Sequence, residues 1–222
     1  MENLKTLLIS ASPHREKSNT FLLAKEVLRG LADSGFQTEI IHLSDCHIDF
    51  CRHCEICHKR FLHCSVKDSV TGILIKMLEA DGIILATPNY INNIAAPMKA
   101  LFDRATHFIH CQRLLGKYMV GVVTSGSGYD TELMKYLQYY ARVCGAQYSG
   151  GISAVGYAIK EKFAEAYQLG MKMAEDIKQK KVYPDQMQII EQGREHFKRV
   201  IQLRKEDWKE EYLYWQKKGW LS

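Results

Sequence analysis

The chain alternates short apolar runs with segments whose apolar residues recur at helical spacing. Continuous runs of branched apolar residues predict strands buried on both faces, and apolar positions three or four residues apart predict helices with one buried face. The predicted strands span residues 5–10, 38–43, 82–87, 118–124 and 146–155. The predicted helices comprise one that Ser18 or Asn19 caps and Gly35 ends, followed by residues 70–78, 95–108, 132–143 and 161–180.

This alternation of strands and helices predicts one fold class. Right-handed crossovers place connecting helices on both faces of a parallel sheet, so we expect a doubly wound five-stranded α/β domain over residues 1–183. Beyond it lies a charged stretch with an apolar stripe at helical spacing, formed by Ile190, Phe197, Ile201, Trp208, Tyr212 and Trp215. It predicts a C-terminal helical extension over residues 184–222 that packs on its own domain or on a second subunit.

Composition narrows the class of protein. The 222 residues are 46% hydrophobic and 25% charged, as in ordinary globular proteins. No apolar run approaches the roughly 20 residues of a membrane-spanning helix. The net charge of +5 comes from mixed acidic and basic stretches, so we expect no membrane and no nucleic-acid partner. Seven cysteines, four of them in one short segment, favour a cytoplasmic protein over an exported disulfide framework.

The loop after the first strand contains residues that suit a phosphate. Ligands of open parallel sheets bind outside the carboxyl ends of the strands, and a helix N-terminus there favours an anion. This loop offers Ser12, Arg15, Ser18, Asn19 and Thr20. It is neither G-x-G-x-x-G nor a P-loop, so no dinucleotide or nucleoside triphosphate is indicated. An ordinary capped helix would show the same residues, and the pattern leaves both interpretations open.

Two further loops lie at the same expected edge. A proline and an aromatic residue follow the third strand, where they can pack along a flat heterocycle; this loop contains Pro88, Asn89, Tyr90 and Ile91. After the fourth strand, Ser125 and Gly126 provide a hydroxyl and a close backbone approach. Ser125 stands where a serine hydrolase elbow requires glycine, which argues against acyl transfer. Plain turns remain the alternative for both loops.

The most specific motif lies in a cysteine-rich loop over residues 46–66. Its spacing is Cys51-x2-Cys54-x2-Cys57-x6-Cys64, which supplies the four thiolates that a [4Fe-4S] cluster requires. Zinc is the rival, because thiolates and imidazoles both suit it and the segment contains His47, His53, His58 and His63. The compact run favours iron–sulfur over the separated ligand pairs of most zinc sites. Free thiols are the third interpretation.

Together these motifs resemble the flavodoxin-like NAD(P)H-dependent FMN reductases, and within them the iron–sulfur flavoproteins. The resemblance covers residues 4 to about 155. Besides the cysteine run, it rests on Ala11-Ser-Pro with Ser18-Asn-Thr, Val66-Lys-Asp68, Ala80-Asp-Gly-Ile-Ile, Thr87-Pro-Asn-Tyr90 and Pro97-Met-Lys-Ala-Leu-Phe-Asp-Arg104.

The resemblance implies two cofactors. The first loop would hold the FMN phosphate, residues 88–91 would line the isoalloxazine, and Ser125 and Gly126 would approach the flavin. The four cysteines would bind a [4Fe-4S] cluster. It also implies NAD(P)H as a possible electron donor and a homodimer or homotetramer with flavin sites near the interfaces.

We therefore expect an FMN-dependent oxidoreductase that passes electrons between a donor and an acceptor, each a small molecule or a small protein. No side chain is assigned as a catalytic acid or base. One alternative is a plain NAD(P)H-dependent FMN or quinone reductase with zinc or no metal in the cysteine loop. The other is a non-enzymatic redox- or metal-responsive module whose C-terminal helix engages a partner.

Overall fold

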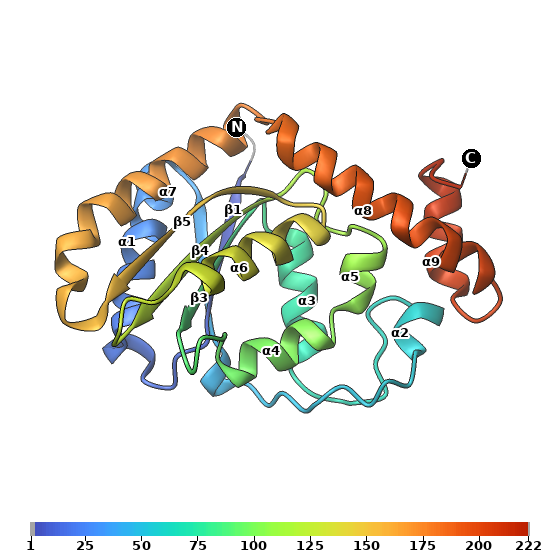
Figure 1. Ribbon diagram of the computed structural model, residues 1–222, viewed down its shortest axis with the longest axis horizontal. Helices are drawn as coiled ribbons and strands as arrows, with labels where there is room; N and C mark the ends of the chain where they lie inside the picture. Colours follow the sequence, from blue (N-terminus) through green and yellow to red (C-terminus); the bar gives the residue numbers. More distant parts are fainter. Residues whose placement is uncertain (1–2, 222) are drawn as a thin grey trace.

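The computed structural model describes residues 3–221; residues 1, 2 and 222 of the predicted domain and extension lie outside the described residues. Its centre is a parallel sheet in the order β2-β1-β3-β4-β5 (Figure 1). The strands are β1 (Lys5–Ser10), β2 (Gln37–His42), β3 (Gly82–Pro88), β4 (Tyr118–Ser125) and β5 (Gln147–Val155). The chain moves outward from β1 to β2 and then returns to β3 on the other side of β1, which creates a switch point between β1 and β3. The predicted doubly wound, flavodoxin-like fold is confirmed.

Helices cover both faces of this sheet (Figure 1). One face is covered by α1 (Asn19–Asp33) and α7 (Phe163–Lys178), and the other by α3 (Val70–Glu79), α4 (Ala96–Asp103), α5 (Thr106–His110) and α6 (Thr131–Val143). Successive strand residues face opposite layers, because side chains alternate along a strand. Leu7 and Ile9 therefore enter the α3–α6 layer, and Leu8 enters the α1/α7 layer.

The remaining elements are short helices and the C-terminal extension. The cysteine loop contains only one helix, α2 (Ile56–Lys59), and three 3₁₀ turns lie at Arg15–Lys17, Leu43–Asp45 and Gly156–Lys162. The extension consists of α8 (Pro184–Leu203) and α9 (Lys209–Lys217), and α9 lies beside α2 (Figure 1). Within residues 3–221, no helix has the length and apolar content needed to cross a lipid bilayer.

The prediction of one continuous helix over residues 95–108 is wrong. The chain leaves helical geometry at Ala105, with φ −103° and ψ 27°, so α4 and α5 are separate helices. Arg104 at this break is buried, and its guanidinium donates to the carbonyl oxygens of Asp49 at 3.1 Å and Val66 at 3.2 Å. These partners lie far away in sequence, which is why helical periodicity alone missed the break.

The C-terminal stripe also differs from a single helix. The chain breaks between α8 and α9, and the apolar side chains of both helices pack around Cys111 in a small core with Ile201, Trp208 and Trp215. The extension therefore packs on its own chain. Whether a second subunit also contacts it stays a prediction.

Candidate functional site

The carboxyl ends of β1, β3 and β4 meet at one edge of the sheet. Backbone hydrogen bonds join the loops after these strands: Ala11 N–H donates to Ala86 O and Asn89 N–H to Thr124 O, both at 2.8 Å. The hydroxyl oxygens of Thr20 on α1 and Thr124 at the end of β4 lie 2.6 Å apart. The three loops predicted from the sequence are therefore neighbours in space.

The first loop forms a capped helix N-terminus. Ser18 is the N-cap of α1, and its Oγ accepts a hydrogen bond from Phe21 N–H at 3.3 Å. Ser12, Ser18 and Thr20 are buried, whereas the half-exposed Arg15 forms an ion pair with Asp45 at 2.9 Å. The first N–H groups of a helix have no partner within the helix, so this end can bind an anion.

The loop after β3 combines an anchored and an exposed part. Asn89 donates its side-chain N–H groups to Tyr129 O at 3.0 Å and to the Asp130 carboxylate at 2.9 Å. Its Oδ1 is buried without a hydrogen-bond partner, so this acceptor remains available to a ligand. Tyr90 is half exposed, and Ile91 is fully exposed with a positive φ of 51°.

The loop after β4 is held by its own side chains. Ser125 Oγ donates to the Asp130 carboxylate at 3.0 Å and accepts from Gly128 N–H at 2.8 Å. At Gly126 an added Cβ would meet nothing within 4 Å, so the space beside this backbone is open. Ser125 therefore shapes the loop, and Gly126 leaves room for a flat ligand.

A fourth loop, which the sequence did not indicate, also lies at this edge. The side-chain amide of Asn19 donates to Gly156 O at 2.9 Å, which ties the start of α1 to the loop after β5. Tyr157 next to it and Tyr129 after β4 are exposed. The glycine–aromatic pair Gly156-Tyr157 directly after a strand was the available signal.

The four cysteines of the run line one cavity of about 250 Å³. Burial raises the pKa of the Cys57 thiol to about 12, and the negative charges of Glu211 and the other three thiolates add to this rise. The Ser65 hydroxyl, 3.1 Å from Cys54 Sγ, and the backbone lower the pKa of the Cys54 thiol. The thiols are therefore close enough to influence one another. The structure thus brings all four cysteines of the predicted set to one cavity.

Arg104 also lines this cavity. Its guanidinium forms a buried ion pair with Asp68, bonds the carbonyls at both ends of the cysteine loop and interacts with the Cys64 thiol. Its Nε–H is buried without a partner. An unpaired donor beside thiols suits a negatively charged, thiolate-bound centre, because sulfur accepts hydrogen bonds weakly but usefully.

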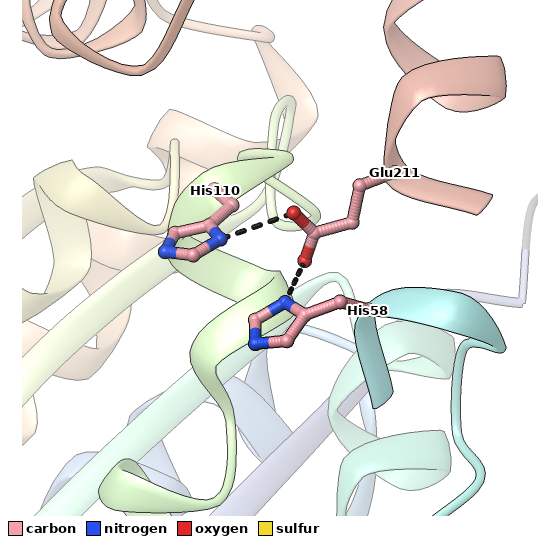
Figure 2. A group of neighbouring side chains, drawn as sticks. All are labelled: His58, His110 and Glu211. Carbon is pink, nitrogen blue, oxygen red and sulfur yellow. Dashed lines mark hydrogen bonds and ion pairs between the residues drawn. The ribbon is translucent and has the colours of Figure 1, made fainter. Parts of the chain in front are cut away.

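A second cluster consists of His58, His110 and Glu211 (Figure 2), and its two histidines also line the cavity. The Glu211 carboxylate contacts His58 Nδ1 at 2.6 Å and His110 Nδ1 at 3.0 Å, and within the described chain these three residues are the set whose possible metal ligands all lie within 4.8 Å. The two imidazoles are stacked with an interplanar angle of 17°, and each contacts a different carboxylate oxygen. Two N–H groups donating to one carboxylate explain this geometry.

Of the four histidines proposed as zinc ligands, His53 and His58 line this cavity, and of these two only His58 is buried. His47 forms an ion pair with Asp49, and His63 Nδ1 bonds Phe61 O at 3.0 Å. His53 lines the cavity but is exposed. No local sequence pattern indicated which distant residues would lie beside the cysteines. These residues are Arg104, His110, Trp208 and Glu211.

Taken together, the sheet order and these loops define a flavodoxin-like α/β protein with a ligand-binding edge. Residues 4–160 match the model of the NADPH-dependent FMN reductase family. An iron–sulfur flavoprotein of Archaeoglobus fulgidus is 31% identical over 98% of this chain and 100% of its own length. One from Methanocaldococcus jannaschii is 43% identical, over 46% of this chain and 52% of its own.

Solved structures show the same fold at low identity. A flavone reductase superposes with a TM-score of 0.65 at 20% identity, covering 79% of this chain and 63% of that one. An NADH:FMN oxidoreductase gives 0.58 at 23% identity, covering 83% and 94%. The chain belongs to the NADPH-dependent FMN reductase family and to its iron–sulfur flavoprotein branch. It is thus an FMN-dependent oxidoreductase, as the resemblance implied.

Proposed function

We propose that this oxidoreductase passes electrons between a donor and an acceptor through FMN at the β1, β3 and β4 loops and a [4Fe-4S] cluster bound by Cys51, Cys54, Cys57 and Cys64. The observation that carries the proposal is the convergence of all four thiols on one cavity that also contains the buried Arg104 guanidinium. When bound, the flavin exchanges one or two electrons and the cluster exchanges one, so together they can link hydride donors to one-electron carriers.

The residues of the sheet edge fit FMN. The N-terminus of α1 with Ser12, Ser18 and Thr20 would hold the phosphate, and Arg15 would contribute if it left Asp45. Pro88, Asn89, Tyr90 and Ile91 would line the ring system, with Asn89 Oδ1 as a free acceptor, and Ser125 and Gly126 would face it from β4.

The thiol geometry favours the cluster over a single zinc ion. Zn–S bonds of about 2.3 Å place tetrahedral thiolates roughly 3.8 Å apart. Within residues 3–221, however, no three of these thiols lie within 4.8 Å of one another. A cubane cluster binds its four thiolates at separate corners and does not require them to meet at one ion.

The two proposed sites lie at opposite ends of α4. This helix starts after the β3 loop, where Thr87 Oγ1 accepts from Ala95 N–H at 3.0 Å, and Asp103 and Arg104 at its other end line the cysteine cavity. Eight residues of helix span about 12 Å. In this proposal one short helix therefore separates the two cofactors. NAD(P)H as the donor, a homo-oligomer and a cytoplasmic location belong to the same proposal.

Anaerobic purification tests the proposal directly. Flavin, iron, sulfide and zinc are measured on one preparation, and the expected result is FMN together with about four irons and four sulfides per chain. FMN with zinc or without metal would instead support the plain reductase. Material that contains no flavin and takes up none from added FMN would contradict both.

Replacing Cys54 by serine is expected to remove most of the iron and leave FMN bound. Cys54 is exposed, so the change disturbs the cavity without opening the core. Iron content and visible absorption measure the loss. The control is Cys46→Ser, outside the run, which should keep the iron. Unchanged iron in Cys54→Ser would remove this residue from the ligand set.

Replacing Asn19 by leucine is expected to weaken FMN retention on the order of 10-fold, because it removes the hydrogen bond to Gly156 O and places an apolar side chain at the anion-binding helix end. Fluorescence titration of the apoprotein with FMN measures the affinity. Lys25→Leu, at an exposed position farther along α1, is the matched control. Equal affinities in the two variants would argue against the phosphate loop.

A further inference from the structure

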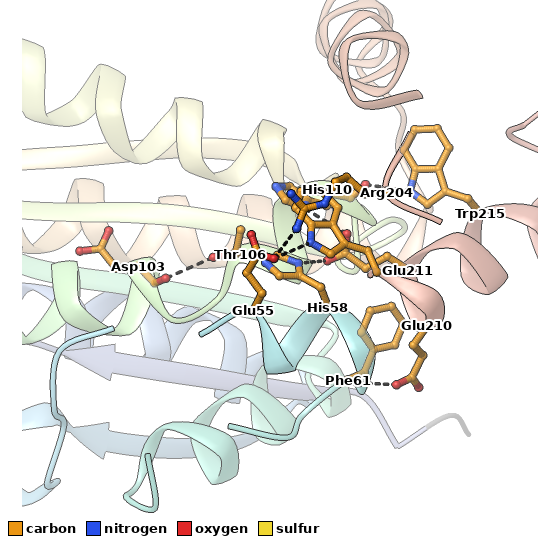
Figure 3. A network of polar contacts seen from close by, with 11 residues as sticks. Glu55, His58, Phe61, Asp103, Thr106, His110, Arg204, Glu210, Glu211 and Trp215 are labelled. Atoms are coloured by element: carbon orange, nitrogen blue, oxygen red, sulfur yellow. Dashed lines mark hydrogen bonds and ion pairs between the residues drawn. The ribbon is translucent and has the colours of Figure 1, made fainter. Parts of the chain in front are cut away.

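The C-terminal helices are joined to the cysteine loop by several independent contacts (Figure 3). Arg204 forms an ion pair with Glu55, and Trp208 Nε1–H donates to the same carboxylate at 3.4 Å. The Glu210 carboxylate accepts from Phe61 N–H. The extension therefore contacts the loop at Glu55 and at Phe61, on both sides of Cys57.

Glu211 is the centre of this contact (Figure 2). It is fully buried and lies 153 positions from His58 in sequence. A buried carboxylate is costly unless its oxygens are paired, and here the Nδ1–H groups of His58 and His110 satisfy one oxygen each. Trp208 stacks on both imidazoles, at 4.4 and 5.0 Å between ring centroids. Three segments are thus locked together through one side chain.

The contact between Glu211 and His58 lies directly beside Cys57 in sequence. His58 follows Cys57 in α2, a helix of four residues, so holding the imidazole also fixes the turn from which the Cys57 thiol projects. Both histidines line the cavity. In each ring Nδ1 donates to Glu211, so Nε2 carries no proton when the ring is neutral. Each Nε2 lies on the side of its ring away from Glu211 (Figure 2).

The cysteine loop needs such support from outside. Between β2 and α3 it has little regular structure, and His53, Glu55 and Leu62 have positive φ angles. Arg104 holds the two ends of the loop, at Asp49 and Val66. Between these anchors, the extension supplies the contacts to α2.

We propose that Glu211 is a positioning residue for the metal centre. By holding His58 and His110, it keeps Cys57 in place for the cluster and makes the C-terminal helices part of the cluster-binding structure. This inference rests on the cluster proposed above. It assigns the extension a role that neither the fold nor the thiol spacing requires.

The test compares Glu211→Gln with the wild-type protein. Glutamine keeps the size but cannot accept from both Nδ1–H groups, because its amide nitrogen has no free lone pair. We expect cluster loss in air on the order of 10-fold faster, with lower iron per chain and unchanged FMN. Bleaching of the visible absorption, iron and sulfide content, and FMN content are measured on the same samples. Glu206→Gln, exposed in the same segment, is the matched control and should behave as wild type.

A mutant cycle then separates positioning from general loss of structure. If Glu211 acts through His58, the double variant with His58→Ala should lose the cluster no faster than His58→Ala alone. Wild-type bleaching in Glu211→Gln, or additive effects in the cycle, would overturn the inference. If Glu211→Gln does not fold, His110→Gln on α5 removes the hydrogen bond between His110 and Glu211 instead. Faster bleaching in that variant would support the positioning role, and wild-type bleaching would overturn it.

The iron content of the wild-type protein is measured first, because it distinguishes failure of the cluster proposal from failure of the positioning role alone. An iron-free wild type overturns both the cluster and the positioning role. An iron-loaded wild type whose Glu211→Gln variant is equally loaded and equally stable in air overturns the positioning role alone.

Discussion

Replacing Arg104 by alanine is expected to destabilise the protein by about 3–5 kcal/mol, because the buried Asp68 carboxylate then loses its counter-charge. The Asp68 and Arg104 side chains are 0% and 1% exposed, so water cannot replace the lost partner. The variant also loses the hydrogen bonds to Asp49 O and Val66 O that hold the ends of the cysteine loop. We therefore expect reduced iron content in addition to the loss of stability.

Denaturant unfolding of the metal-free protein measures this change without a contribution from the cluster. Lys99→Ala provides the control on the same helix, since Lys99 forms an exposed pair with Asp103 four residues away. Exposed pairs of this kind contribute less than about 1 kcal/mol. If both variants were equally stable, the buried ion pair would not anchor the loop in the way that the structure indicates.

Replacing Gly170 by alanine is expected to destabilise the protein by about 2–3 kcal/mol, because overpacking at a close helix contact forces the backbones apart. Gly170 on α7 faces α1, and an added Cβ would lie 2.1 Å from Val27 O. That neighbour is backbone, so no side-chain rotation relieves the clash. The two helices that cover one face of the sheet would have to separate, and one of them is α1, whose N-terminus follows the proposed phosphate loop.

The opposite result is expected for the glycine of another helix. Gly72 in α3 is exposed, and an added Cβ would meet nothing within 4 Å. Gly72→Ala should therefore stabilise the protein by about 0.5–1 kcal/mol, because alanine restricts the unfolded chain and favours the helix. Thermal and denaturant unfolding of both variants show whether each substitution raises or lowers the free energy of unfolding. A Gly170→Ala protein as stable as the wild type would contradict the close contact between α1 and α7.

Patterns among neighbouring residues were sufficient to predict the strands and the helix cap. A strand buried on both faces is a continuous apolar run, so β3 and β4 were predicted almost to the residue. Ser18 was recognised as a possible cap for the same reason, because a cap and the helix it begins are adjacent in sequence. The break between α4 and α5 was missed because it accompanies contacts of Arg104 with residues 36 to 55 positions away.

By itself the sequence determined the layered α/β fold, the family, the three loops at one sheet edge and the cysteine spacing. Each of these features depends on patterns among residues that are close together in the chain. Only the tertiary structure decided what surrounds the thiols: Arg104 and Asp68 at the ends of the loop, and His110, Trp208 and Glu211 from distant helices. The physical reason is that a buried charge is stable only beside a partner of suitable chemistry. Here those partners are up to 153 positions apart, and no periodic pattern records such a pairing.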